Sequence, residues 1–289
     1  MMAATAASPP AAAPTWAAVM AQAGDENFPV ASRLVGARRR SQLLAIYGFA
    51  RLVDDAGDVA TGDRSALLDW IEGDLDRIYA GTTPEHPVLR ALVPTVRTLA
   101  LPAAPFRQLI EANRRDQVVH RYRTFAELLD YCQLSAAPVG ELVLYVFGAA
   151  TADRIRLSDR ICAGLQITEH LQDVAEDRAR GRVYLPDEDL AQFGCTDADL
   201  LACPPRPRFV ELMRFEAERA RALLDDGVPL IRRLPVRAAW AVAGFVAGGC
   251  AALDGIAAAG YDVLADRPRT SRRSFAVALI KTIWEGRCR

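Results

Sequence analysis

Apolar residues recur along this 289-residue chain at the three- and four-residue spacing of α-helices, and no stretch of useful length alternates as a β-strand does. The pattern predicts an all-α protein with helices over residues 38–60, 65–80, 87–98, 104–119, 125–149, 154–179, 208–226, 236–259 and 271–285. Residues 184–207 contain four prolines and predict a long loop with short helical turns. No internal repeat recurs and no linker divides two cores, so we expect a single-domain helical bundle.

Residues that cap helices stand at several of these predicted ends. Asp63 precedes one helix as an N-cap candidate, and Gly81 follows the last residue of the same helix. Thr124 and Glu127 form a capping box at the start of the helix at 125–149. Gly181 follows the helix at 154–179, where a left-handed glycine is expected.

Two segments raise the question of a membrane or a targeting signal. Residues 1–23 are rich in Ala and Pro but lack a basic start, which favours a disordered N-terminus over a signal peptide. Residues 238–260 are long enough to cross a bilayer, yet they are rich in Ala and Gly and contain Asp254. We therefore expect this run to be a buried helix of the bundle.

Composition narrows the class of protein. Apolar residues make up 51% of the chain, enough for a large core, and the net charge of −1 gives no general attraction for nucleic acid. The six cysteines include no C-x-x-C pair, which favours reduced thiols in a cytoplasmic protein over disulfides or a zinc site.

A polar stripe follows the otherwise apolar helix at 38–60. Tyr47, Arg51, Asp54 and Asp58 stand at successive spacings of four, three and four, which places them on one face of a helix, with Asp55 close by. Because unpaired buried charges are costly, this face must meet water or a polar cavity.

The helix at 154–179 repeats the design. Its polar positions are Gln166, Glu169 or His170, Asp173 and Asp177, with Glu176 close by. Either acidic stripe alone is typical of a solvated helix face, whereas two stripes on mostly apolar helices favour a shared site. Clustered carboxylates without cysteine favour Mg²⁺, which completes its shell with water and substrate phosphates. The sequence therefore predicts a diphosphate held by Mg²⁺ between two acidic helices, with Arg51 as a phosphate partner.

The helix at 125–149 could line a pocket beside this site. Tyr131, Ser135 and Val139 share a face, small residues such as Gly140 permit close approach, and Pro138 is expected to kink the helix. Tight helix packing and a lined ligand channel are both open interpretations. An apolar channel beside a diphosphate site would indicate a prenyl diphosphate substrate.

Four motifs carry a resemblance to a known family. They are ENFPVAS at 26–32, YGFARLVDDAGD at 47–58, YCQLSAAPVG at 131–140 and LQITEHLQDVAEDRARGRVYLP at 165–186. Together they resemble the squalene/phytoene synthase family of head-to-head trans-prenyltransferases. With GYDVLADRPR at 260–269, the chain is most similar to the hydroxysqualene synthases of the bacterial hopanoid pathway. The resemblance implies the class I terpene synthase fold, a helical bundle with a central cavity.

The resemblance also implies roles for matching positions. The candidate Mg²⁺ ligands are Asp54, Asp55, Asp58, Asp173, Glu176 and Asp177. The residues it implies in contact with the substrate or the reacting centre are Ser32, Tyr47, Arg51, Tyr131, Gln166, Arg182 and Tyr184, and the helix face described above adds Ser135 and Val139 as substrate contacts. Glu169 stands where the family has asparagine, and it could act as a further metal ligand or alter how the cation is quenched. His170 could orient a water, or both residues could be a lineage variant hydrogen-bonded at the cavity wall.

For the hydroxysqualene synthases, the resemblance implies Mg²⁺-dependent loss of diphosphate from presqualene diphosphate, rearrangement of the cation and capture by water, with no NADPH. The alternatives are formation of presqualene diphosphate or squalene from farnesyl diphosphate, formation of phytoene, and a prenyl-lipid-binding subunit without catalysis. Other enzymes of the pathway are the expected protein partners.

Residues 265–289 form a basic segment and a last helix that follow the synthase domain expected at 24–264. Arg267, Arg269, Arg272 and Arg273 precede an amphipathic run, which is compatible with peripheral contact at the inner face of the cell membrane. The alternative is a helix packed on the bundle behind a solvated basic lead-in.

Overall fold

A computed structural model of the chain describes residue 14 and residues 36–265, 267–268 and 271–288. Within these ranges the protein is helical, with one isolated parallel bridge between Arg121 and Val183 and no β-strand, so the all-α prediction is confirmed. The helices are α2 (Ala37–Asp58), α3 (Arg64–Tyr79), α4 (Pro87–Leu99), α5 (Ala104–Arg115), α6 (Phe125–Ser135), α7 (Ala137–Val146), α8 (Ala152–Gln172), α9 (Val174–Ala179), α10 (Asp187–Gln192), α11 (Pro207–Gly227), the 3₁₀ helix η3 (Val228–Arg233), α12 (Val236–Ala258) and α13 (Arg272–Cys288).

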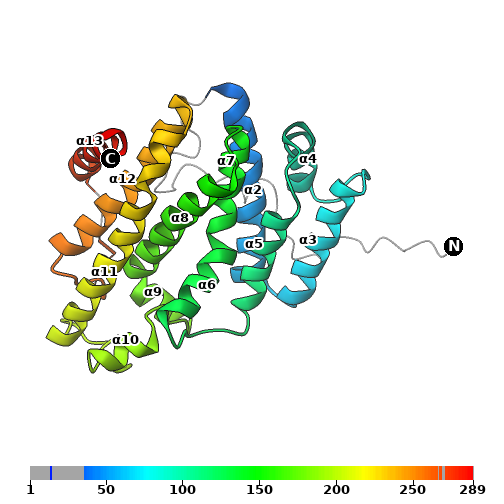
Figure 1. Cartoon of the computed structure of the whole chain (residues 1–289). Coiled ribbons are helices and arrows are strands. Elements are labelled where there is room, and N and C mark those ends of the chain that lie inside the picture. The colour runs from blue at the N-terminus through cyan, green and yellow to red at the C-terminus, as the bar shows by residue number, and fades with distance from the viewer. Residues whose placement is uncertain (1–13, 15–35, 266, 269–270, 289) are drawn as a thin grey trace.

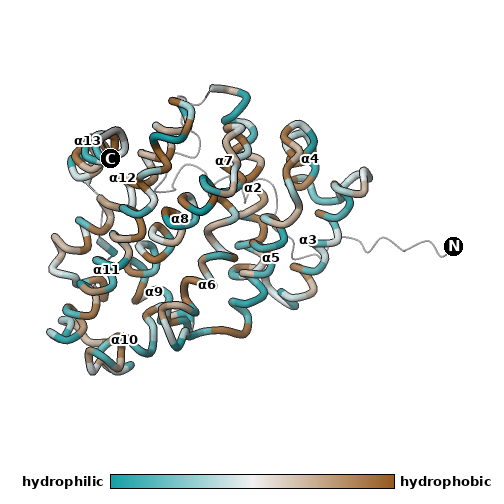
Figure 2. The backbone as a smooth tube through the Cα atoms, in the orientation of Figure 1, coloured by the Kyte–Doolittle hydropathy of each residue, from teal (hydrophilic) through white to brown (hydrophobic). Residues whose placement is uncertain are grey.

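The bundle is organised around α8 and α2. Helix α8 packs against α6, α7, α11 and α12, and α2 packs against α3, α4, α5 and α7 (Figure 1). The buried apolar side chains form one cluster. Figure 2 shows apolar and hydrophilic positions interspersed along the helices, as expected for helices with one buried side. The close contact of α8 with α11 depends on Gly164, where a Cβ would lie 3.0 Å from the carbonyl oxygen of Ala220.

The predicted helix ends are largely confirmed. Asp63 accepts an amide hydrogen bond at the start of α3, and Thr124 accepts one from the Glu127 amide at the start of α6, 3.2 Å away. Gly81 and Gly181 have φ angles of +79° and +81°, the left-handed conformation expected after a helix.

The helix predicted at 125–149 is divided into α6 and α7 at Ala136, which has φ −117° and ψ −45°. Pro138 explains the division, because it lacks an amide hydrogen and its ring obstructs the carbonyl group one turn earlier. The expected kink is therefore a complete interruption.

The helix predicted at 154–179 is also divided, and here the prediction of one continuous helix is wrong. Helix α8 ends at Gln172 and α9 begins at Val174, with Asp173 between them at φ −106° and ψ 16°. No proline or glycine marks this position in the sequence. The loop predicted at 184–207 contains a short helix, α10, as expected. The 3₁₀ helix η3, between α11 and α12, was not predicted.

The apolar run at 238–260 belongs to α12, which is long and apolar enough to cross a membrane by length and composition. It packs instead against α8, α11, η3 and α13, and 61% of its most apolar window is buried. This arrangement agrees with a buried bundle helix.

Some predictions fall outside the described residues. Apart from Pro14, residues 1–23 are among these, so their disorder stays a prediction.

Helix α13 packs against α12 and η3, and Ala278 joins the common core, so the last helix is part of the bundle.

Candidate active site

The predicted polar stripe is present on α2. Asp54 and Asp58 are exposed and Tyr47 and Arg51 are half-buried, whereas most residues between them are buried. The spacing therefore directs these side chains to one open side of a core helix, as expected.

Asp54 is exposed to solvent at the open side of α2. Solvent reaches its side chain, yet protein surrounds it, and the resulting loss of hydration raises the pKa of Asp54 to about 6. The negative charges of Asp58 and Asp55 add to this rise. Asn113 on α5 opposes it by donating a hydrogen bond to Asp54 Oδ1 at 3.1 Å, and Arg51 opposes it by its positive charge.

Asp55 faces a different partner. It is buried, and its Oδ1 lies 2.8 Å from Arg51 Nη2. This ion pair holds the guanidinium beside the stripe. Arg51 Nε is buried and has no hydrogen-bond partner among the described residues, so Arg51 keeps a donor that could meet an anion.

The second acidic motif begins at the break after α8. Asp173 Oδ1 lies 2.8 Å from Arg267 Nε, but the N–H group does not point at it, so this buried oxygen forms an ion pair without a hydrogen bond. Burial raises the pKa of Asp173, and the charges of Asp177 and Glu176 raise it further. Asp173 is thus a carboxylate with an unsatisfied oxygen.

Asp177 and Glu176 on α9 have different surroundings. Asp177 Oδ2 lies 3.6 Å from His170 Nδ1, on the inner side of the helix. Glu176 is exposed, and its Oε1 lies 2.7 Å from Arg180 Nη2. Of the two, Asp177 is the better placed to act inside the site.

Arg182 connects the two motifs. It follows α9 in the turn at 181–186, and its Nη2 donates a hydrogen bond to Asp58 Oδ1 on α2 at 2.8 Å. The Val183 amide donates to the His120 carbonyl at 2.8 Å and fixes this turn against the chain after α5. The turn therefore lies against the end of α2 that carries the first acidic motif.

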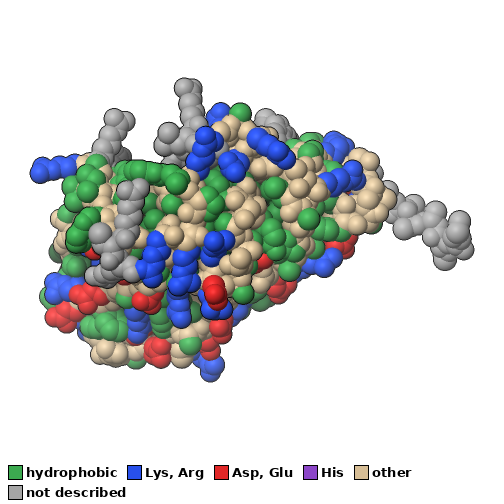
Figure 3. All heavy atoms as spheres, turned by 45° about the horizontal axis from the view of Figure 1, so that its top comes forward, with side chains coloured by type: hydrophobic (Ala, Val, Ile, Leu, Met, Phe, Trp, Pro, Cys, Tyr) green, Lys and Arg blue, Asp and Glu red, His purple; other side chains and the backbone are tan. Residues whose placement is uncertain are grey.

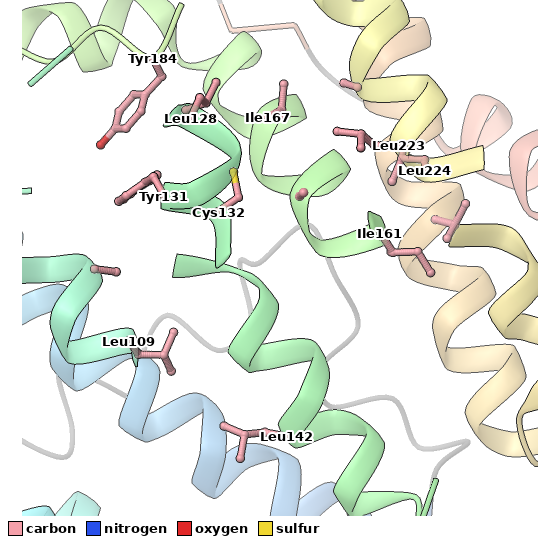
Figure 4. Close-up of a cluster of buried hydrophobic side chains, with 14 of the residues drawn as sticks. Leu109, Leu128, Tyr131, Cys132, Leu142, Ile161, Ile167, Tyr184, Leu223 and Leu224 are labelled. Carbon is pink, nitrogen blue, oxygen red and sulfur yellow. The ribbon is translucent and has the colours of Figure 1, made fainter. Parts of the chain in front are cut away.

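An aromatic cluster lies beneath this turn. Tyr131 on α6 donates a hydrogen bond to Asp116 Oδ2 at 2.7 Å, and the Tyr184 hydroxyl lies 3.5 Å from Asp116 Oδ1. Tyr184 also stacks on His170, with ring centroids 3.7 Å apart, and Tyr122 packs against both tyrosines. Figure 4 shows Tyr131 and Tyr184 pointing in the same direction from different elements. Burial raises the pKa of Asp116, although the Tyr131 hydrogen bond and Arg182 lower it.

Asn113 and Asp116, on and just after α5, were not predicted from the sequence. Asn113 holds Asp54, Asp116 holds the tyrosines, and Gln117 donates a hydrogen bond to the Gly57 carbonyl at 3.0 Å. These three polar positions have the same helical spacing that marked α2 and α8, which is a signal that could have found them. Arg267 was expected only as part of a basic lead-in.

The predicted channel residues have different surroundings. Ser135 Oγ is buried without a hydrogen-bond partner among the described residues, and Val139 is exposed. Gly140 serves tight packing, because a Cβ there would collide with Ser158 and Cys162 of α8. Close packing thus explains Gly140, while Ser135 and Val139 stay candidates for contact with a ligand.

Gln166 and His170 lie one turn apart on α8, with their Nε2 atoms 3.2 Å apart. The Gln166 amide nitrogen can only donate, so this contact is a hydrogen bond when His170 Nε2 carries no proton. Glu169 is half-buried beside them. A polar array therefore lies between the aromatic cluster and Asp177.

Comparison with known proteins decides the family. The model of the squalene/phytoene synthase family matches residues 21–274. The chain belongs to this family. A hydroxysqualene synthase from Rhodopseudomonas palustris is 40% identical over 214 residues, covering 71% of this chain and 70% of the relative. A phytoene synthase from Arthrospira platensis is 37% identical over 221 residues, covering 70% and 71%. The crystal structure of squalene synthase HpnC from Alicyclobacillus acidocaldarius matches with a TM-score of 0.77 and 41% identity, covering 86% of this chain and 94% of that one.

As a member of the squalene/phytoene synthases, the protein is an enzyme of isoprenoid biosynthesis, and the prediction of family and fold is confirmed. The family acts on prenyl diphosphates. The motif at 26–32, with its diphosphate candidate Ser32, lies outside the described residues.

The carboxylates of this synthase fit a hard divalent cation by their chemistry. Asp54, Asp58, Asp173 and Asp177 offer only oxygen donors, and one Asp173 oxygen is unsatisfied. Over the described ranges, no three acidic, histidine or cysteine side chains yet converge on one point. Arginines pair with two of these aspartates instead, and a cation would have to draw the carboxylates together.

Proposed function

We propose that this synthase converts presqualene diphosphate to hydroxysqualene in a Mg²⁺-dependent reaction, in bacterial hopanoid biosynthesis. Its similarity to a hydroxysqualene synthase, at 40% identity, and to a solved squalene synthase, at 41% identity, supports this proposal. Phytoene synthases are almost as similar, so similarity alone does not separate the two reactions.

Diphosphate would be bound between α2 and the turn after α9. Arg51 Nε has no hydrogen-bond partner among the described residues. Arg182 is permanently charged and donates a hydrogen bond to Asp58. Asp54, Asp58, Asp173 and Asp177 would hold Mg²⁺. When bound, Mg²⁺ would supply positive charge that stabilises the departing diphosphate. The arginines would assist the same charge separation, because negative charge grows on the leaving oxygen as the bond breaks.

The observation that carries the proposal is the contact of His170 with Gln166, Tyr184 and Asp177. Loss of diphosphate breaks one C–O bond, whose electrons leave with the oxygen. After the carbon skeleton rearranges, a water forms a new C–O bond to the cation and gives up a proton. His170 Nε2 could hold this water in place of the Gln166 amide and accept that proton. Because one C–O bond replaces another, no reductant is required, and NADPH is not expected.

The test is a product analysis. We would incubate the protein with Mg²⁺ and without NADPH, with presqualene diphosphate, farnesyl diphosphate or geranylgeranyl diphosphate in separate tubes, and identify the products by mass spectrometry. Hydroxysqualene from presqualene diphosphate supports the proposal. Presqualene diphosphate from farnesyl diphosphate, or phytoene from geranylgeranyl diphosphate, would assign one of the alternative reactions.

Two substitutions separate the steps. Asp54→Asn is expected to abolish diphosphate release, while Asp153→Asn, an exposed aspartate at the start of α8, should not. His170→Phe keeps a ring to stack on Tyr184 but removes the nitrogens. We expect it to release diphosphate while forming a hydrocarbon instead of the alcohol. Unchanged hydroxysqualene output from His170→Phe would contradict the role of His170.

A further inference from the structure

Large apolar side chains are exposed together at one end of the bundle. On α12, Val236 is 71% exposed and Trp240 is 46% exposed; on α13, Val277, Ile280 and Trp284 are 61%, 71% and 67% exposed. The α13 residues follow one another at spacings of three and four, so they form one stripe. The opposite side of α13 packs on the bundle through Ala278 and Thr282. Soluble proteins rarely leave such a surface uncovered without a partner.

The two helices meet at this end. Helix α13 packs against both α12 and η3, and a Cβ at Gly286 would lie 3.1 Å from Ile231 of η3. Trp284 is two residues from this contact, and Val236 is five residues beyond Ile231. We refer to Val236, Trp240, Val277, Ile280 and Trp284 as the apolar face.

Basic residues surround the apolar face. Arg232, Arg233 and Arg237 flank Val236 in the chain and are exposed, and Lys281 is exposed within the α13 stripe. No acidic residue occurs between residues 227 and 253 or between 271 and 284. The nearest acids along the chain are Asp226 before the first stretch, Asp254 after it and, on α13, Glu285, 3.9 Å from Lys281.

A basic hollow adjoins the same end. It has a volume of about 510 Å³, and its lining includes Arg38 and Arg39 at the start of α2 and Arg237 at the start of α12. Arg39 lies over the Phe147 ring, 5.5 Å from the centroid. In Figure 1 the starts of α2 and α12 both lie at the top, with α13 beside α12. Figure 3 turns this end forward and shows hydrophobic and basic side chains interspersed over it.

We propose that this end of the enzyme docks on an anionic lipid bilayer, with the apolar face inserted at the level of the headgroups and the arginines against lipid phosphates. Exposed tryptophans beside basic residues are the composition expected at a membrane interface. A second copy of the chain is the poorer occupant, because two copies of this face would bring like charges together. Helix α12 does not cross the bilayer, since it is built into the core.

The docking end and the acidic site lie at opposite ends of α2. Arg38 and Arg39 stand in the first turn of α2, and Asp54 and Asp58 stand in its last turns. At 1.5 Å per residue, the docking end and the acidic site lie roughly 25–30 Å apart along this helix. Charged diphosphate therefore meets the enzyme on the side away from the membrane, while the apolar part of the bundle adjoins the lipid. This inference concerns the surface and holds whichever family reaction the enzyme performs.

The test is sedimentation of the full chain with vesicles. Wild-type protein should sediment with vesicles containing phosphatidylglycerol, bind pure phosphatidylcholine more weakly, and detach as salt is raised. Trp240→Ser with Trp284→Ser should lower binding to anionic vesicles at least tenfold. The matched control is Val118→Ser with Leu201→Ser, two apolar residues outside the apolar face that are at least as exposed as the tryptophans, and it should bind as wild type does.

A second variant, Arg232→Gln with Arg233→Gln, tests the charges if the tryptophan variant does not fold, and it should weaken the salt dependence. Detergent-solubilised substrate should be turned over normally by both variants, which separates this proposal from the proposed reaction. Wild-type protein that stays in the supernatant, binding unaffected by either variant, or a stable dimer that the tryptophan substitutions dissociate would each overturn the proposal. So would tight vesicle binding that appears only after residues 1–35 are removed, because that would make the N-terminal segment the normal occupant.

Discussion

Gly57 lies between the two aspartates of the first acidic motif, and its replacement by alanine tests how that motif is held. A Cβ at Gly57 would collide with Asn113 Oδ1 and would lie 3.0 Å from Cγ and 3.2 Å from Cβ of the same side chain. Asn113 cannot easily yield, because it is buried and bonds both Asp54 Oδ1 at 3.1 Å and the Leu109 carbonyl at 3.2 Å.

Two opposing effects set the change in stability that Gly57→Ala causes. Alanine is favoured over glycine within a helix by about 0.5–1 kcal/mol. Against this, overpacking costs about 1–3 kcal/mol, and loss of the Asn113 hydrogen bond to a charged carboxylate costs about 1.5–3 kcal/mol. The two costs overlap, since moving the amide relieves the collision. We expect Gly57→Ala to destabilise the fold by about 1–3 kcal/mol, or roughly 2–5 °C in Tm for a chain of this size.

Thermal unfolding at a fixed scan rate measures this loss, and Gly73→Ala is the matched control. Gly73 lies in the interior of α3, is exposed, and has open space where a Cβ would stand. Its replacement should raise stability by about 0.5–1 kcal/mol. Combining Gly57→Ala with Asn113→Ala should be little worse than Asn113→Ala alone, because the obstacle is gone. If Gly57→Ala is as stable as wild type, or if the two losses simply add, the collision with Asn113 is not what restricts this position.

Three further predictions concern the site. Because Asp54 has a pKa raised to about 6 and must be ionised to bind a cation, activity should fall as pH drops through about 6, and higher Mg²⁺ should move this limb of the pH–rate profile to lower pH. Arg182→Ala removes the partner of Asp58, so KM for the prenyl diphosphate should rise at least tenfold, while calorimetry without substrate should show metal binding as tight as in wild type or tighter. Tyr131→Phe should cost about 1–3 kcal/mol at neutral pH, because buried Asp116 loses its shortest hydrogen bond. That bond lowers a pKa already raised by burial, so its loss raises the pKa further; the variant should lose stability as pH rises and approach wild type in acid, as equilibrium unfolding across pH would record.

Much of the fold could be predicted from the sequence because its determinants are local. Helical periodicity located the long helices, and the caps at Asp63 and Thr124 fixed where two of them begin. The stripe on α2 was predictable for the same reason, since residues three and four apart share a face on any helix. Pro138 likewise predicted a kink, at the place where the structure has a complete break between α6 and α7.

The remaining features depend on contacts between distant segments. Asp116 belongs to the site because Tyr131 and Tyr184, from two other elements, contact its carboxylate. Arg267 belongs to it because the segment after α12 lies against Asp173. The break at Asp173 carries no proline or glycine, so no local pattern distinguished α8 from α9. Periodicity extended one helix through a position where tertiary packing ends it.

The pairing of arginines with the site's aspartates couples the binding of the two expected ligands. Asp58 is held by Arg182, 124 residues away in the chain, and Asp173 by Arg267. A divalent cation arriving alone would compete with these guanidinium groups for the same oxygens. A diphosphate would offer the displaced arginines new partners, so each ligand lowers the free energy required to admit the other. By thermodynamic linkage, diphosphate must then tighten metal binding by the same factor as metal tightens diphosphate binding. The apo enzyme would therefore bind magnesium weakly and gather its ligands as a pair.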